Sequence, residues 1–208
     1  MRLLLSCAVS TITFDDPSIY SFVRPTDISG QVKEGFIWQS AYLIVPFSGA
    51  GNPNACTLGN QPTTNGYANA VVSQPQALAF FVGTTGYPQG YVCASPSSKA
   101  FIPQTVAATA AWKDGMTLSL TGHGATGNAI SSHTTTINYG APTIVDLTTL
   151  GQIYAMSFNA TGGTPACRDY SPGTEMSFDN FVAISKSNTS AHGCSWMFSG
   201  HPCDYNVA

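Results

Sequence analysis

The segment "MTLSLTGHG", Met116–Gly124, alternates between apolar and small polar residues over its first six positions. Successive side chains of a β-strand point to opposite faces of a sheet, so this period of two predicts a strand with one buried and one solvated face. The same alternation recurs between Gly, Pro and Asn clusters in "TITF" (11–14), "GFIWQSAYLIV" (35–45), "ANAVVS" (68–73), "ALAFFV" (77–82), "HTTTINY" (133–139), "TIVDL" (143–147), "IYAMSFNA" (153–160) and "EMSFDNFVAIS" (175–185). Many short strands with turn signals between them predict an all-β sandwich or barrel in one domain.

Three segments depart from this pattern. "PQTVAATAAWKDG" (103–115) is rich in alanine and is either one or two turns of helix or the edge of a strand. Residues 46–66 and 83–99 are rich in Gly, Pro, Asn and Ser and are predicted to be long loops, each with one cysteine. Loops of that length are uncommon unless they are functional or cross-linked.

The composition excludes some classes of partner. Only 8% of the 208 residues are charged, the net charge is −3, and seven Lys and Arg residues cannot form a basic track for nucleic acid. After residue 10, no apolar run approaches the roughly 18 residues that a membrane-spanning helix needs. Polarity comes mainly from Ser, Thr, Asn, Gln and Gly, as is common in extracellular β-proteins.

The termini and cysteines favour a secreted protein. "MRLLLSCAVS" (1–10) looks like the remnant of a signal peptide, although it is short for one and could instead form a first strand. Six cysteines without any C-x-x-C pair favour disulfides over a zinc site, and their positions favour Cys56–Cys93 and Cys194–Cys203, with Cys7 and Cys167 left open. Asn159 and Asn188 each begin an N-glycosylation tripeptide.

Two strands far apart in the chain end in similar acidic phrases, "TITFDD" (11–16) and "MSFDNF" (176–181). If a sandwich places its first and last strands side by side, Asp15, Asp16, Asp179 and Asn180 converge at one edge. Three close carboxylates repel one another unless a cation lies among them, and oxygen ligands without His or Cys suit calcium. The alternative is that these residues are simply a turn and a strand edge.

The order of several motifs resembles that of a family of uncharacterised secreted fungal proteins. The motifs are "TITFDD", "EGFIW", "NGYANAVVSQPQALAFF", "FIPQTVAATAAWKDGMTLSLTGHG" and "SFDNFVAI", which together cover most of residues 11–185. The resemblance implies a jelly-roll β-sandwich like those of carbohydrate-binding modules, with a structural calcium ion that joins the first strand to the last. Asp15, Asp16 and Asp179 are then candidate ligands, and Asn180 a weaker one. Residues 186–208 are expected to form a cystine-containing extension.

Catalytic signals are weak. No G-x-S-x-G or metalloprotease motif occurs, and most acids beyond the candidate metal site lie beside turn residues, with Glu34 and Glu175 the two that could face a cleft. His123 and His133 could meet across a hairpin and hold copper or zinc. Trp38 and Trp112 are expected in the core. Sugar rings stack on exposed aromatic side chains, for which the sequence offers Tyr67, Tyr87, Tyr91 and Trp196.

The sequence therefore predicts a secreted, non-catalytic carbohydrate-binding protein with a calcium ion. An extracellular structural or surface-interaction protein without a small ligand is the alternative, and a polysaccharide-active enzyme comes third.

Overall fold

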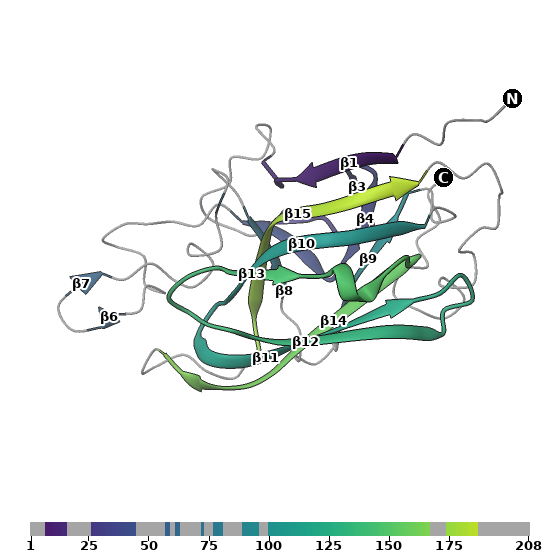
Figure 1. Ribbon diagram of the computed structural model, residues 1–208. Helices are drawn as coiled ribbons and strands as arrows, with labels where there is room; N and C mark the ends of the chain where they lie inside the picture. Colours follow the sequence, from purple (N-terminus) through teal and green to yellow (C-terminus); the bar gives the residue numbers. More distant parts are fainter. Residues whose placement is uncertain are drawn as a thin grey trace, which may run out of the picture.

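The computed structural model describes residues 7–15, 26–44, 57–58, 61–62, 72, 77–80, 89–95, 100–166 and 174–186. Two antiparallel sheets pack face to face (Figure 1). Sheet A has the order β13-β10-β15-β8-β5-β2, with β1 also paired to β15, and sheet B has the order β12-β11-β14-β9-β4-β3. A hairpin of two short strands, β6 (Thr57–Leu58) and β7 (Gln61–Pro62), stands apart from both sheets.

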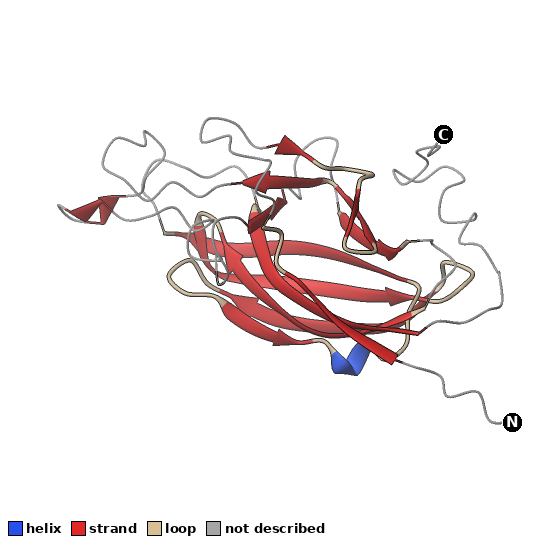
Figure 2. Ribbon diagram, turned by 90° about the horizontal axis from the view of Figure 1, so that it is seen from above, coloured by secondary structure: helices blue, strands red, loops and turns tan. Residues whose placement is uncertain are grey.

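The strands of sheet A are β1 (Cys7–Ile12), β2 (Thr26–Asp27), β5 (Ala41–Ile44), β8 (Ala77–Phe80), β10 (Phe101–Ala110), β13 (Thr143–Asp146) and β15 (Met176–Lys186). Those of sheet B are β3 (Val32–Lys33), β4 (Phe36–Gln39), β9 (Gly90–Ala94), β11 (Lys113–His123), β12 (Ala129–Ile137) and β14 (Ala155–Pro165). The 3₁₀ turn η1 (Thr148–Leu150) follows β13 and is the single helical turn in the described part of the chain (Figure 2). From β9 to β15 the chain changes sheet at every step except the β11–β12 hairpin, which confirms the predicted jelly-roll sandwich.

The alternation of apolar and polar residues decides which side of each strand is buried. In β11, Met116, Leu118 and Leu120 are at most 1% exposed and belong to the core, whereas Thr117 and Ser119 are exposed on the outer face. Between the sheets lies a cluster of aromatic rings that includes Trp38, Phe80, Phe101, Phe158, Phe178 and Phe181. Burial of such rings is the main stabilising contribution that this sequence supplies.

The alanine-rich segment is a strand and not a helix. β10 lies between β13 and β15 in sheet A, with Val106 and Ala108 in the core. Ala107 and Thr109, which alternate with them on the other side, are at most 1% exposed, so both faces of this strand are covered. Small residues fit such a doubly covered position, and tertiary packing overrides the helix propensity of alanine.

The loop predictions are wrong in part. Gly90–Ala94, inside the expected loop 83–99, is strand β9 in sheet B, and β6 and β7 lie inside the expected loop 46–66. Residues 7–10, within the stretch assigned to a signal remnant, form the first part of β1. The extension after residue 186 lies outside the described residues. No helix in the described part of the chain has the length and apolarity to cross a membrane.

Candidate functional site

The two acidic phrases meet where β15 changes partner. Residues 181–186 of β15 pair with β1, from Ile12↔Phe181 to Cys7↔Lys186, and residues 176–178 pair with β8. Asp179 and Asn180 lie between these two stretches. On the other side of β15, Thr105 pairs with Val182 and Ala107 with Asp179, so Asn180 and Phe181 together oppose one residue of β10. This is a β-bulge, and Asn180 adopts the left-handed conformation there (φ 48°).

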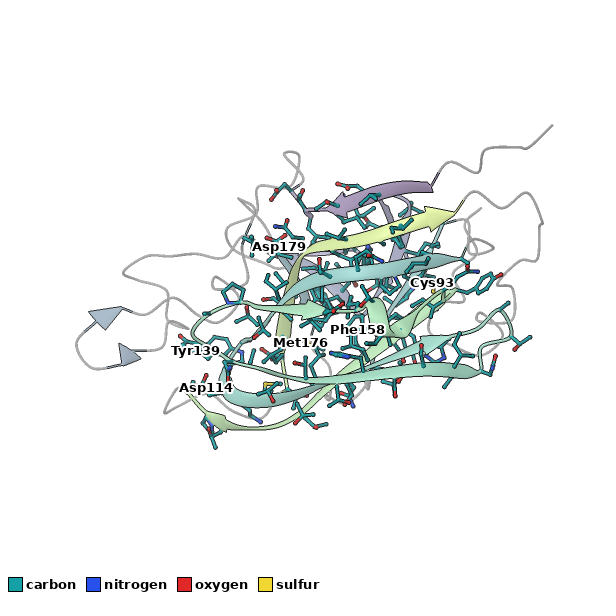
Figure 3. The ribbon with its side chains drawn as sticks, viewed as in Figure 1. Cys93, Asp114, Tyr139, Phe158, Met176 and Asp179 are labelled. Atoms are coloured by element: carbon teal, nitrogen blue, oxygen red, sulfur yellow. The ribbon has the colours of Figure 1, made fainter. Side chains whose placement is uncertain are left out.

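Asp179, which is labelled on β15 in Figure 3, is fully buried. Its Oδ2 accepts a hydrogen bond from the backbone N–H of Val72 (2.7 Å), and its Oδ1 accepts one from the N–H of Asn180 (2.7 Å). Beside it, the Oδ1 of Asn180 is buried without a hydrogen-bond partner. A buried carbonyl oxygen that lacks a donor is unfavourable, so this atom is a candidate cation ligand.

The rest of the predicted metal site is only partly described. Asp15 is half-buried near the end of the first phrase, and Asp16 lies outside the described residues. In the described part of the chain, no three His, Cys, Asp or Glu side chains lie close enough together to hold a metal ion. The described residues therefore place a partnerless amide oxygen beside a buried carboxylate at this junction. The calcium ion and the convergence of all four residues stay predictions.

Glu34 lies within electrostatic range of Asp15. Burial raises the pKa of Glu34 above its ordinary value of 4.5, repulsion from Asp15 raises it further, and Lys33 lowers it. Glu34 also adopts the left-handed conformation (φ 46°) in the turn between β3 and β4. Its carboxyl is mostly exposed, and its position fits a turn.

Glu34→Gln is expected to flatten the pH dependence of stability. The folded protein binds the Glu34 proton more tightly than the unfolded chain, because its pKa is raised on folding. The free energy of unfolding therefore decreases as pH rises from about 4.5 through the raised pKa, and the glutamine variant lacks this decrease. Urea unfolding at a series of pH values, with chelator present, measures it. Equal slopes for the two proteins would contradict this assignment.

The outer face of sheet B carries a row of polar side chains with one aromatic residue. Direct register pairs connect Ser132 to Thr121, Thr121 to Ser157, Ser157 to Tyr91, and Tyr91 to Gln39. Directly opposed residues of an antiparallel pair point to the same face. These five side chains, which we call the Tyr91 row, therefore line up across strands β12, β11, β14, β9 and β4.

Tyr91 lies in strand β9 near the centre of sheet B, and not in a loop as the sequence suggested. Its side chain is half-buried, and its hydroxyl donates a hydrogen bond to Oε1 of Gln89 (3.0 Å). Next to it, Gln39 is 2% exposed and its Nε2 has no hydrogen-bond partner. The partly exposed ring of Tyr91 can stack on a sugar ring, whereas the amide of Gln39 is too buried to contact a ligand.

His123 holds Ser157 of the Tyr91 row in place. Its Nε2 lies 2.8 Å from Oγ of Ser157, and its Nδ1 lies 3.0 Å from the carbonyl oxygen of Gly127. His133 pairs with Leu120 and so lies on the inner face of sheet B, whereas His123 lies on the outer face. The predicted metal pair is therefore wrong. His123 is three residues from Leu120, the partner of His133, and residues an odd number apart along a strand point to opposite faces.

The remaining predicted site residues are dispersed or outside the described residues. Cys93 is buried on β9, and Asn159 is half-buried on β14. Trp38 and Trp112 are buried, as expected. Outside the described residues lie Tyr67, Tyr87, Trp196, Cys56, Cys194, Cys203 and Asn188. The predicted disulfides and glycan sites therefore stay predictions.

The acids beyond the strand junction have local roles. Asp114 accepts the N–H of Tyr139 (2.8 Å), and Asp27 accepts the N–H of Ser29 (2.8 Å). Asp146 accepts both the N–H and the hydroxyl of Thr148, which holds the pKa of Asp146 below its ordinary value. Glu175 accepts the indole N–H of Trp112 (2.5 Å). The contacts of Asp27 and Asp146 are those of turn residues. Asp114 and Glu175 instead bind groups that are distant in the sequence, a backbone N–H and a core indole.

Several solved structures have a similar fold. A DUF4465 family protein from Bacteroides caccae aligns with a TM-score of 0.51 at 10% identity, over 86% of this chain and 100% of that chain. Another from Bacteroides ovatus has a TM-score of 0.46 at 10% identity, over 87% of this chain and 99% of that chain. The CBM22-1-GH10 modules of xylanase 10B from Clostridium thermocellum align with a TM-score of 0.37 at 10% identity, over 88% of this chain and 29% of that chain.

The first of these similarities shows a shared β-sandwich and, at this level of identity, nothing about function. No family model matches the chain, and no curated protein matches its sequence. The fold implied by the motif resemblance is therefore supported by structure, while the fungal family itself is not identified by sequence.

Proposed function

We propose that this protein binds carbohydrate, without catalysis, on the outer face of sheet B. The observation that carries the proposal is the Tyr91 row, in which one half-buried aromatic ring stands between hydroxyl and amide side chains. Sugar rings present apolar C–H faces to aromatic rings and hydroxyls to polar side chains, and this row offers the ring of Tyr91 together with the accessible hydroxyls of Thr121 and Ser132. The low charge and the cysteine content support a secreted setting for such binding.

Tyr91→Ala is expected to weaken polysaccharide binding by about tenfold or more, because the loss of a stacking ring removes both apolar contact area and a hydroxyl. Affinity electrophoresis or isothermal titration with a panel of soluble polysaccharides measures the change. Tyr139→Phe is a matched control, since Tyr139 is buried against Trp112 and Ala111, away from sheet B's outer face. If the wild-type protein binds no polysaccharide, the result favours the alternative, a structural or surface-interaction protein without a small ligand.

The absence of catalysis in this proposal is supported by the local roles of Asp114, Asp146 and Glu175. A glycosidase needs two carboxyl groups on either side of the scissile bond, and these three acids are engaged with different turns or a core indole. Release of reducing sugar from a bound polysaccharide would contradict the proposal.

We also propose that a calcium ion stabilises the junction between β1 and β15. Support comes from the partnerless Oδ1 of Asn180 and the buried carboxylate of Asp179. The ligand set would combine these groups with Asp15 and Asp16, and the ion would supply the positive charge that relieves repulsion among the carboxylates.

Calcium is accordingly expected to raise the melting temperature, and chelator to lower it. Asn180→Ala should reduce the calcium-dependent part of the shift, whereas Asp27→Ala, which removes a turn carboxylate elsewhere, should leave that part unchanged. Calorimetric titration with calcium gives a second readout. Equal melting temperatures with calcium and with chelator would remove the ion from the proposal.

A further inference from the structure

The outer face of sheet B holds a regular array beyond the Tyr91 row. Strands β11, β12 and β14 each contribute three alternate residues, and register pairs connect them in three rows: Thr136–Thr117–Thr161, Thr134–Ser119–Asn159 and Ser132–Thr121–Ser157. Eight of the nine carry a hydroxyl and the ninth an amide. We call these nine residues the hydroxyl array.

The array is accessible and largely unused by the protein itself. Six of its members are exposed, namely Thr117, Ser119, Ser132, Thr134, Thr136 and Thr161. Among the nine, within the described part of the chain, the side chain of Ser157 alone makes a hydrogen bond to another residue, His123. The Oδ1 of Asn159 is buried without a partner. The six exposed hydroxyls of the array therefore face water, whereas Ser157 is 6% exposed and Oδ1 of Asn159 is buried.

The geometry of the array repeats in two directions. Neighbouring strands lie about 4.8 Å apart and alternate residues about 6.7 Å apart along each strand. One row continues through Tyr91 to Gln39, so the Tyr91 row spans four strand spacings, about 19 Å. The hydroxyls of this row run from Ser132 to Tyr91, over three strand spacings or about 14 Å, and end before the buried Gln39. A line of repeating hydroxyls suits a ligand with repeating hydroxyls, and a polysaccharide chain is such a ligand.

The charge of the surface selects among polysaccharides. Neither the hydroxyl array nor the Tyr91 row contains Asp, Glu, Lys or Arg. The outward side chain of β11 that carries charge is Lys113, four residues beyond Thr117 and so about 13 Å away along the strand. An acidic glycan finds no cation in the array and meets a protein with a net charge of −3, and a basic glycan finds no carboxylate there.

From these observations we infer that the ligand is a neutral polysaccharide whose chain lies across the strands of sheet B, with one ring on Tyr91 and the following rings over the hydroxyl array. This inference rests on the proposed carbohydrate binding and names its substrate class and the extent of its site. Binding uses hydrogen bonds from many weak partners, so affinity increases with the length of the chain.

The test compares two charge insertions in the array with one matched insertion outside it. Thr134→Glu places a carboxylate in the middle row of the array, and Ser119→Glu places one at its centre. Thr11→Glu inserts the same charge at an exposed position of β1, on sheet A. Binding is measured by isothermal titration with hydroxyethylcellulose, arabinoxylan and galactomannan as neutral probes and with polygalacturonate and alginate as acidic probes. Thermal melts verify that all variants are folded.

The wild-type protein is expected to bind at least one neutral probe and neither acidic probe. Both array variants should bind that probe about tenfold more weakly or worse, because an uncompensated carboxylate is desolvated beneath the ligand, and Thr11→Glu should bind as the wild type does. Equal binding of acidic probes overturns the neutral class. If Tyr91→Ala loses binding while the array variants bind as the wild type does, the array is not a subsite, but the proposed function stands. If the wild-type protein binds none of the probes, both the proposed carbohydrate binding and the inferred neutral ligand are overturned.

Discussion

Gly90→Ala is expected to destabilise the protein by about 3 kcal/mol, which for a chain of this size lowers the melting temperature by roughly 10 °C. Gly90 pairs directly with Phe158 across β9 and β14, and a Cβ on Gly90 would overlap three carbons of the Phe158 ring. The ring has no room to withdraw. It is 1% exposed and packs edge-on against Phe80 (centroids 4.5 Å apart) and tilted against Phe178 (4.9 Å).

Two variants isolate the steric cause. Gly140→Ala is the matched control, because a Cβ on Gly140 meets no atom within 4 Å, and the smaller entropy of the unfolded alanine chain makes this change neutral or slightly stabilising. Phe158→Leu in the Gly90→Ala background removes the two ring carbons that overlap most, Cε2 and Cζ, so the double variant should be more stable than the sum of the single effects predicts. Urea unfolding of the wild type, Gly90→Ala, Phe158→Leu, the double variant and Gly140→Ala gives the comparison. Additive losses would show that the ring is not what opposes the new methyl group.

Trp38→Ala is expected to cost about 4 kcal/mol. Trp38 is fully buried at the centre of the aromatic cluster, with ring centroids 5.0 Å from Phe14 and 5.3 Å from Phe181, both edge-on. These neighbours belong to the segment after β1 and to β15, so the indole of β4 links sheet B to the two elements at the strand junction. Removing it leaves a cavity between the sheets that rigid neighbours fill only in part.

Trp38→Phe separates the loss of volume from the loss of the polar group. The Nε1–H of Trp38 is buried without a hydrogen-bond partner, which is itself unfavourable. Phenylalanine keeps an aromatic ring for the edge-on contacts and removes that orphan donor, so its cost is expected to stay below about 1.5 kcal/mol. Thermal and urea unfolding of both variants measure the difference. A phenylalanine variant as unstable as the alanine variant would mean that the indole donor has an unseen partner.

Strand alternation made the sandwich predictable. The alternation of Met116, Leu118 and Leu120 with polar residues predicts the buried side of β11, and the structure places these three residues in the core. β10 was ambiguous because its signal is compositional: Ala107 and Thr109 are buried on the side where a half-solvated strand would show polar residues. A strand covered on both faces has no period of two to detect.

The candidate site was predictable only in its residue types. Tyr91 was expected to contact ligand, but its flanking Gly and Pro residues suggested a loop, and only the pairing with Gln39 and Ser157 shows that it stands in a sheet. Gln39 and Ser157 carried no signal of their own, since polar residues on alternating strands are ordinary. Register between strands that are distant in sequence assembles the row, and a single sequence does not encode that register in readable form.

The partner change in β15 also decides how this protein yields to mechanical force. In the described part of the chain β1 pairs with β15 alone, through six residue pairs that begin at Cys7↔Lys186, the ends nearest the two termini. Tension applied between the termini would therefore break the backbone hydrogen bonds of these pairs one after another and not all at once. The detachment proceeds to Ile12↔Phe181 and arrives at Asn180, where the bulge and the buried Asp179 carboxylate begin. We therefore expect the first strand to detach at a lower force than the junction.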